Sequence, residues 1–121
     1  MTDGIIVFAH GSRVETANEA VRAVARGVVR ATGCAQVAAA FLELGQPDLA
    51  GAADRLVAAG VDRLVVIPYF LTLGLHMERD LPRLVAEIVE RHPGVRVEVA
   101  PPLDGHPELV AIVADRYREL A

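Results

Sequence analysis

The sequence predicts an α/β domain of three layers, in which a four-stranded parallel sheet carries helices on both faces. Short apolar segments alternate with amphipathic helical stripes along the whole chain, and such alternation is typical of parallel sheets. No linker or low-complexity tract interrupts the pattern, and 121 residues are within the usual range of one domain. We therefore expect residues 1–121 to form a single domain.

Four segments have the composition of strands. GIIVFAH (4–10) and DRLVVIPYF (62–70) are almost continuously apolar, which is typical of parallel strands buried on both faces. AQVAAAFL (35–42) is weaker because alanine is a poor strand former, and VRVEVAPP (95–102) alternates as an edge strand does. These properties favour the flavodoxin-like order 2-1-3-4, with the two most apolar strands at the centre and right-handed crossovers.

Each strand is followed by apolar residues at helical spacing, and most stripes end at a helix-breaking signal. Thr32-Gly33 stops the first helix, Pro47 fits the first turn of the second, Gly60 ends it, and His92-Pro93-Gly94 closes the third. Pro107 opens the fourth. The residues expected to face inward are Val21, Val24, Ala25, Val28 and Val29, then Leu49, Ala52, Ala53, Leu56 and Val57, then Leu81, Leu84, Val85, Ile88 and Val89, and last Leu109, Ile112, Val113, Tyr117 and Leu120.

Composition excludes several classes of protein. The formal net charge of -4 gives no basic face for nucleic acid. No apolar run approaches the ~18 residues of a membrane span, and the first residues lack the basic region of a signal peptide, so a cytoplasmic protein is expected. The single cysteine, Cys34, excludes an internal disulfide and is expected to be a small buried hydrophobe. A hydrophobic share of 53% hints at a buried partner surface.

Two histidines are expected at the same edge of the sheet. His10 ends the first strand and His76 follows the third by a short loop, so both belong beside the crevice at the carboxyl ends of the central strands, where ligands bind in such sheets. Two imidazoles from separate segments predict a divalent-metal site. Glu43 ends the second strand and can add an oxygen ligand or proton carrier, while YFLTLGL (69–75) offers an apolar wall that Gly74 lets turn sharply.

Each of these residues also has a purely structural interpretation. A histidine after a strand can cap a helix or bond a carbonyl group, Glu43 can be a solvated strand end, and the apolar loop can be core or dimer surface. His92 is expected to interact with the dipole at a helix C-terminus. His106 is expected beside an N-cap, with a peripheral ligand role left open.

The start of the third helix is expected to be ordinary in structure. Asp80 is predicted to cap it, with Pro82 in the first turn. Glu78 and Arg79 are then most simply solvated residues at the helix start.

Four segments in order resemble one enzyme family. They are AHGSR (9–13), AFLELGQPDL (40–49), VVIPYFLTLGLHMERDLP (65–82) and RHPGVRVEVAPPLDGHPELV (91–110), and they cover nearly the whole chain. The chain resembles the short, single-domain sirohydrochlorin chelatases, class II chelatases that insert Co²⁺ or Fe²⁺ (Ni²⁺ in some archaeal members) into a tetrapyrrole without ATP. The family often has a glycine where Ala9 stands and a basic residue where Leu75 stands.

The resemblance implies roles for individual residues. His10 and His76 would bind the metal and catalyse, and Glu43 matches an acidic residue at the active site. Arg13 and Arg79 could pair with substrate carboxylates, although both can equally be ordinary surface arginines. The other residues expected at the macrocycle are Ser12, Phe70, Leu73, Gly74 and Leu75.

The same resemblance implies an assembly and a reaction. A homodimer is expected, since larger relatives carry two such domains in one chain. The divalent metal, Co²⁺ first and otherwise Fe²⁺ or Ni²⁺, is a substrate, and no organic cofactor is expected. One imidazole or Glu43 would accept the pyrrole protons, and the product would feed cobalamin or sirohaem biosynthesis.

Two other classes of function compete with insertion. A metal or tetrapyrrole carrier could use the same two histidines without catalysing. A phosphotransfer or nucleotide-binding domain is suggested by HGSR (10–13) between a strand and a helix. That second class ranks lower because the glycine-rich phosphate loops and the nucleophile elbow are missing from the sequence.

Overall fold

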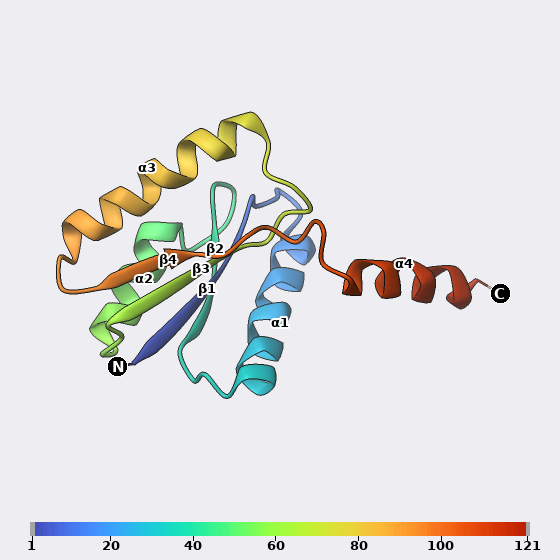
Figure 1. The fold of residues 1–121 in the computed structure, drawn as a ribbon, viewed down its shortest axis with the longest axis horizontal. Coiled ribbons are helices and arrows are strands. Elements are labelled where there is room, and N and C mark those ends of the chain that lie inside the picture. The colour runs from blue at the N-terminus through green and yellow to red at the C-terminus, as the bar shows by residue number, and fades with distance from the viewer. Residues whose placement is uncertain (1, 121) are drawn as a thin grey trace.

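The apolar segments and helical stripes become four strands and four helices in the computed structural model, which describes residues 2–120 (Figure 1). All neighbouring strands pair in parallel, in the order β2-β1-β3-β4. This confirms the predicted fold class and strand order. The elements in chain order are β1 (Asp3–Ala9), α1 (Glu15–Thr32), β2 (Val37–Phe41), α2 (Leu49–Ala58), β3 (Arg63–Pro68), α3 (Leu75–Arg91), β4 (Arg96–Val99) and α4 (Glu108–Glu119).

The ends of the first two helices follow from local chemistry. Gly33 takes a φ of 74° as the left-handed cap of α1, a conformation that glycine adopts at little cost. Asp48 caps α2, because its side chain accepts a hydrogen bond of 2.8 Å from the Gly51 N–H. The prediction for Pro47 is wrong by a small margin, since this residue precedes the cap and is not in the first helical turn.

The predicted start of α3 is also wrong. The helix begins at Leu75 with Gly74 as its N-cap, and the Glu78 N–H donates to the Gly74 carbonyl at 3.0 Å. Asp80 and Pro82 therefore lie within the helix, not at its cap and in its first turn. The early start has a packing reason, because Met77 is buried in the core. His76 is consequently a residue of the first helical turn.

The core has two parts, one on each face of the sheet. On the α2 and α3 side, the buried residues Ile6, Phe8, Leu64 and Val66 pack against the two helices. On the other side, a smaller cluster forms between α1 and the half of the sheet made by β1 and β2. The predicted stripes of α1, α2 and α3 supply most of the buried helical residues.

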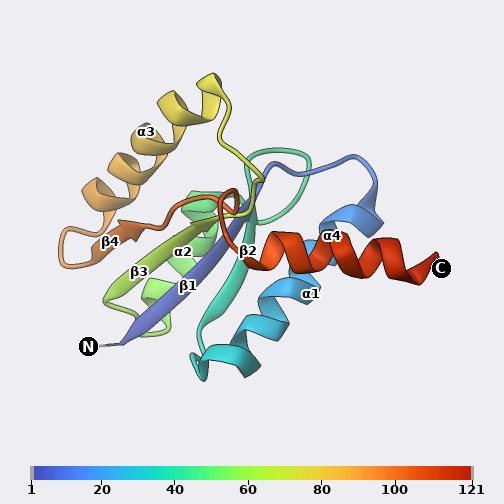
Figure 2. The ribbon, with the colours of Figure 1, turned by 45° about the vertical axis from the view of Figure 1, so that its right-hand side comes forward.

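The prediction for the last helix is wrong. We expected Leu109, Ile112, Val113, Tyr117 and Leu120 to face inward, but α4 has no buried residue within the part of the chain described. Val113 is 70% exposed and Tyr117 74% exposed. Figure 1 shows α4 projecting beyond the end of the sheet, away from the other helices and strands, whereas in the turned view of Figure 2 it overlaps α1 only in projection. The stripe is apolar, but its own domain does not cover it.

The displacement of α4 leaves half of one sheet face open. Helix α1 packs on β2 and β1 only. On the neighbouring strand β3, Leu64 and Val66 are fully buried against α2 and α3, whereas Val65 and Ile67 on the opposite face are only half-buried. A central strand of a three-layer domain is normally covered on both faces, but no helix of residues 2–120 covers this face of β3.

Charged and polar groups join the strands at the amino end of the sheet. The Arg63 guanidinium lies 2.8 Å from Asp3 Oδ2 and 2.7 Å from Glu98 Oε2, and its hydrogen bond holds the pKa of Glu98 below the ordinary value. The Cys34 thiol donates to the Asp3 carbonyl at 3.4 Å and is partly exposed, so the expectation of a small buried hydrophobe is wrong. Across residues 2–120, we find no helix with the length and apolar character that crossing a membrane requires.

The central strand gives a test of this core. Leu64→Ala removes a side chain that is 0% exposed, and the cavity should lower the free energy of unfolding by about 2–5 kcal/mol. Urea denaturation followed by circular dichroism measures the change. Val14→Ala at a site 61% exposed is the control and should stay within about 0.5 kcal/mol of the parent. Equal effects of the two substitutions would contradict the described core.

Candidate active site at the carboxyl edge of the sheet

Strand register brings His10 and Glu43 together. Ala9 of β1 pairs with Phe41 of β2, and the ladder continues past both strands, because the Glu43 N–H donates to the His10 carbonyl at 3.1 Å. The His10 Nε2 atom then lies 3.7 Å from Glu43 Oε1, with the side chains 58% and 57% exposed. The structure thus confirms that Glu43 reaches the same edge as His10.

The two segments approach so closely that only glycine fits at position 11. Gly11 has a φ of +95°, and a Cβ atom built there would lie 1.7 Å from the Glu43 carbonyl oxygen. The HGSR turn therefore needs its glycine for two reasons, a left-handed backbone and direct contact with the neighbouring loop. His10 has its Nδ1 atom 3.3 Å from the Gly11 carbonyl oxygen.

Asn18, which was not among the predicted site residues, connects the same two segments. It is 1% exposed, and its amide bonds to the backbone of Ser12 and of Leu44. A signal for it was present, because position 18 continues the inward stripe of Val21 and Ala25. A polar residue on a buried stripe requires hydrogen-bond partners, and here these partners lie in the site.

His76 lies at the same end of the molecule, in the first turn of α3, and is exposed. The segment that leads to it begins beside β1, since the Tyr69 N–H donates to the Phe8 carbonyl at 2.7 Å. Within residues 2–120, no three His, Cys, Asp or Glu side chains form a group that could hold a metal ion. The convergence of His10 and His76 on one ion therefore stays a prediction.

The predicted apolar wall divides into core and exposed residues. Phe70 packs edge-on against Phe8 with ring centroids 6.1 Å apart, and Leu73 packs against the core. Leu75 is 79% exposed and Leu71 is 68% exposed, and Leu44 in the loop after β2 is 50% exposed. Leu44 was missed by the sequence analysis, and it has a positive φ of 57° beside Glu43. These exposed leucines are available to cover a flat ligand, whereas Phe70 is only partly exposed.

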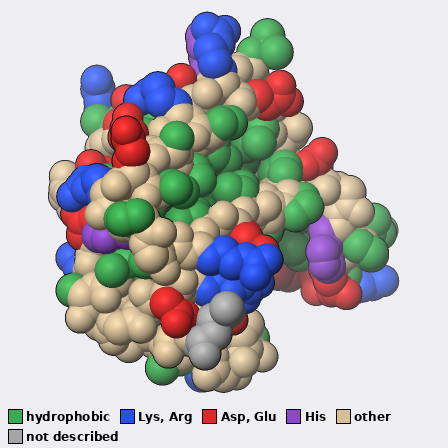
Figure 3. All heavy atoms as spheres, turned by 60° about the vertical axis from the view of Figure 1, so that its left-hand side comes forward, with side chains coloured by type: hydrophobic (Ala, Val, Ile, Leu, Met, Phe, Trp, Pro, Cys, Tyr) green, Lys and Arg blue, Asp and Glu red, His purple; other side chains and the backbone are tan. Residues whose placement is uncertain are grey.

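An apolar groove continues from this wall along α3. It is about 680 Å³ in volume and runs between α3 and β4. Figure 3 shows hydrophobic side chains gathered in this hollow. Its apolar lining consists of Leu73, Met77, Leu81, Pro82, Val85, Ala86, Val89 and Val99.

The remaining predicted site residues divide between structure and surface. Arg13 and Arg79 are exposed, and neither forms an ion pair within residues 2–120. Ser12 supports its own turn, because its hydroxyl oxygen accepts from the Val14 N–H at 3.0 Å. Both arginines are thus free to meet an acidic ligand, whereas Ser12 has a structural role.

The other two histidines have structural partners. His92 ends α3, and its Nε2 atom lies 2.7 Å from Asp54 Oδ1 of α2. His106 precedes α4, and its Nδ1 atom accepts from the Glu108 N–H at 3.1 Å. The His106 ring therefore serves the start of α4, as expected of a residue beside the N-cap.

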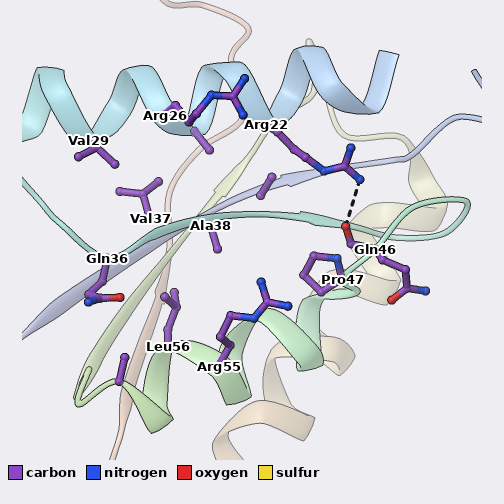
Figure 4. A pocket seen from close by; sticks show the side chains of 13 residues that line it. Arg22, Arg26, Val29, Gln36, Val37, Ala38, Gln46, Pro47, Arg55 and Leu56 are labelled. Atoms are coloured by element: carbon purple, nitrogen blue, oxygen red, sulfur yellow. Dashed lines mark hydrogen bonds between the residues drawn. The ribbon is translucent and has the colours of Figure 1, made fainter. Parts of the chain in front are cut away.

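A second cleft, without histidines, follows the free edge of β2. Arg22 of α1 and Arg55 of α2 point towards it, whereas Arg26 lies along α1 (Figure 4) and pairs with Glu19. Arg22 donates to the Gln46 carbonyl at 3.3 Å and lies over the Phe41 ring, so it holds the loop after β2 against α1. The hydrogen bond from Arg22 also keeps the pKa of Glu15 below its ordinary value.

Comparison with known proteins identifies the family. A model of the CbiX family matches residues 4–120. The chain belongs to the CbiX family. The chloroplastic sirohydrochlorin ferrochelatase of Arabidopsis thaliana is 34% identical over 116 residues, covering 96% of this chain and 52% of the plant protein. The sirohydrochlorin cobaltochelatase of Methanopyrus kandleri is 26% identical over 135 residues, covering 95% and 94% respectively.

A solved structure extends the CbiX comparison to three dimensions. The sirohydrochlorin chelatase SirB from Bacillus subtilis subspecies spizizenii, in complex with cobalt, superposes with a TM-score of 0.91 at 27% identity. The match covers 100% of this chain and 52% of that one. The chain thus spans about half the length of the plant and Bacillus relatives, but nearly the whole of the Methanopyrus one. The resemblance inferred from the motifs is confirmed.

The contact at Gly11 gives a test of the site. Gly11→Ala forces a Cβ into the Glu43 carbonyl and strains a φ of +95°, so we expect a loss of at least ~1–3 kcal/mol in the free energy of unfolding. Gly74→Ala is the matched control, because its added Cβ meets nothing within 4 Å. Thermal denaturation compares the two variants. A Gly11→Ala protein as stable as Gly74→Ala would contradict the described contact.

Proposed function

We propose that this CbiX-family chain is a sirohydrochlorin chelatase, which inserts a divalent metal ion into the tetrapyrrole without ATP. The observation that carries the proposal is the pairing of His10 with Glu43, 3.7 Å apart at the carboxyl edge of the sheet. This edge is where parallel α/β sheets bind ligands, and both residues belong to the segments that match the chelatases. The cytoplasmic location expected from the sequence stays a prediction.

The imidazoles are the groups that would hold the incoming metal. His10 Nδ1 lies beside the Gly11 carbonyl, and an N–H at Nδ1 that donates there leaves the Nε2 lone pair for the ion. His76 would supply the second nitrogen from the first turn of α3. Two protein ligands leave open positions on the metal, which the tetrapyrrole nitrogens then take as bound water leaves.

Proton transfer falls to the carboxylate. Insertion of a divalent ion displaces the protons of the pyrrole nitrogens, and these need an acceptor on the metal side of the ring. Glu43 is exposed and adjacent to His10, so it can take the two ring protons one after the other as a general base and pass each to solvent before accepting the next. The macrocycle keeps its charge balance, since the dipositive metal replaces two N–H protons.

The substrate carries many carboxylates, although the protein has a net charge of -4. Arg13 and Arg79 support its binding because both are exposed and without an ion-pair partner within residues 2–120. Leu44, Leu71 and Leu75 expose apolar surface that could lie against the ring and keep water from the exchanging metal. Arg13 and Arg79 would thereby offset the unfavourable charge locally.

The proposed nitrogen ligands decide which metal ions the site can accept. Nitrogen ligands accept Co²⁺, Fe²⁺ and Ni²⁺ alike. We place Co²⁺ first and Fe²⁺ second, supported by relatives named for cobalt and for iron. The product would enter cobalamin or sirohaem biosynthesis, and the reaction would need no organic cofactor.

Removal of the second histidine tests insertion. His76→Ala should lower the rate of Co²⁺ insertion by at least ~100-fold, because the ion loses one of its two proposed nitrogen ligands while an exposed side chain is removed from a folded protein. Anaerobic absorption assays with sirohydrochlorin and Co²⁺, Fe²⁺ or Ni²⁺ measure initial rates. The control is His92→Ala, which removes a histidine outside the site.

The same assay separates an enzyme from a carrier. A parent protein that does not exceed the uncatalysed rate with any of the three metals would refute the chelatase and favour the carrier. A His76→Ala variant with full turnover would refute the role of His76 alone.

We further propose that the chain works as a homodimer in which α4 of each copy covers the open sheet face of the other. Support comes from both surfaces, because α4 exposes an apolar stripe and β3 leaves Val65 and Ile67 half-exposed where no helix of residues 2–120 covers them. Reciprocal exchange of a terminal helix closes with two-fold symmetry and fills both positions at once. Family members of double length provide room for two such domains in one chain.

One substitution on α4 tests the dimer. Val113→Lys places a charge in the middle of the apolar stripe. Because Val113 is 70% exposed within one chain, the substitution should dissociate the dimer without unfolding the domain. Asp115→Lys on the opposite side of the helix introduces the same residue as a control. Sedimentation equilibrium measures the mass of each variant. A parent protein that is monomeric at ~100 µM, or a dimeric Val113→Lys, would contradict the exchange.

A further inference from the structure

Asn18 has more contacts with the active-site loops than its place in a helix requires. Its Oδ1 atom accepts from the Ser12 N–H at 2.9 Å, and its Nδ2 group donates to the Ser12 carbonyl and to the Leu44 carbonyl, both at 2.9 Å. A weaker contact of 3.3 Å joins Nδ2 to Glu15 Oε2. The two amide hydrogens are thus directed mainly at backbone carbonyls of two different loops.

These two loops carry the proposed reacting groups. Ser12 is two residues after His10, and Leu44 directly follows Glu43. We propose that Asn18 is a positioning residue, which fixes the distance between His10 and Glu43 by tying their loops to one side chain of α1. This inference rests on the proposed chelatase function.

The local geometry shows that the connection is built tightly. Leu44 has a φ of 57°, which a leucine rarely adopts without support from its surroundings, and its carbonyl is one of the groups bound by Asn18. Next to it, a Cβ added at Gly45 would lie 2.9 Å from the Phe41 ring and 3.2 Å from Asn18 Nδ2. Glycine at position 45 therefore leaves room for both the Phe41 ring and the amide.

Helix stability does not account for an asparagine at this position. Asparagine is a poor residue in a helix interior, and position 18 belongs to the stripe on which Val21 and Ala25 pack. An apolar side chain would suit the packing but would leave the backbone groups of Ser12 and Leu44 without their partner. The amide thus contributes the link between the loops, a role that no apolar residue can supply.

Loss of the Asn18 hydrogen bonds should lower the insertion rate because Glu43 would no longer be held beside His10. Asn18→Ala should reduce kcat/KM for Co²⁺ insertion by ~10–100-fold, the usual effect of losing a group that orients a reacting residue. In a Glu43→Gln background, the same substitution should cost less than ~3-fold, because residues that act as one unit have non-additive effects. A merely structural asparagine would give the same factor in both backgrounds.

Two further variants make the test decisive. Thr32→Ala is the control, because Thr32 also joins its side chain to the backbone of α1 and of the following turn but lies at the far end of the helix, and its kcat/KM should stay unchanged. Asn18→Asp keeps the acceptor for Ser12 and removes the donors, so it should lose turnover as Asn18→Ala does. Circular dichroism and urea midpoints establish that each variant is folded.

The outcomes separate this inference from the proposed function. A parent protein without insertion activity would refute the chelatase itself. An active parent with unchanged or additive effects of Asn18→Ala would overturn the positioning role and leave the chelatase intact. If neither Asn18 variant folds, the amide is needed for the fold, and the positioning role is likewise overturned.

Discussion

Parallel pairing of β1 with both β2 and β3 is the constraint on which the rest of the structure depends. Because the three strands run in the same direction, their carboxyl ends meet at one edge, with Ala9 beside Phe41 and Phe8 beside Pro68. The segments that leave those ends carry His10, Glu43 and His76, residues that are far apart in sequence. Register, more than any single side-chain contact, therefore decides which functional groups become neighbours.

Exposure of the site is consistent with the chemistry proposed for it. His10 and Glu43 are each more than half exposed, and the ion pair that they can form is weak at such a distance and exposure. The site must bind and release both a metal ion and a large ring. Side chains that are positioned by their backbone, and not by a strong contact with each other, stay free to bind these ligands. Gly11 allows the loops of His10 and Glu43 to touch, and Asn18 forms hydrogen bonds with both loops.

Sequence patterns predicted the sheet well and some helix details badly, for physical reasons. The continuous apolar runs predicted which strands are central, because a strand that is buried on both faces has apolar side chains on both faces. The stripe of α4 correctly predicted an apolar helix face, but a periodic pattern does not indicate whether the same chain or another chain packs against that face. Asp80 and Pro82 were misplaced because cap signals are local, whereas the burial of Met77 decides where α3 starts. The role of Asn18 was not predicted because its partners are backbone atoms of two loops, which sequence patterns do not place beside it.

The projecting α4 makes assembly a question of concentration. In the proposed dimer, two separate chains must meet before either has a complete third layer, so both stability and activity would fall on dilution. In a double-length relative, a covalent connection between two such halves would replace this encounter by an effective local concentration in the millimolar range. In the proposed dimer, the uncovered α4 would thus make the protein depend on its own abundance, a dependence that fusion would remove.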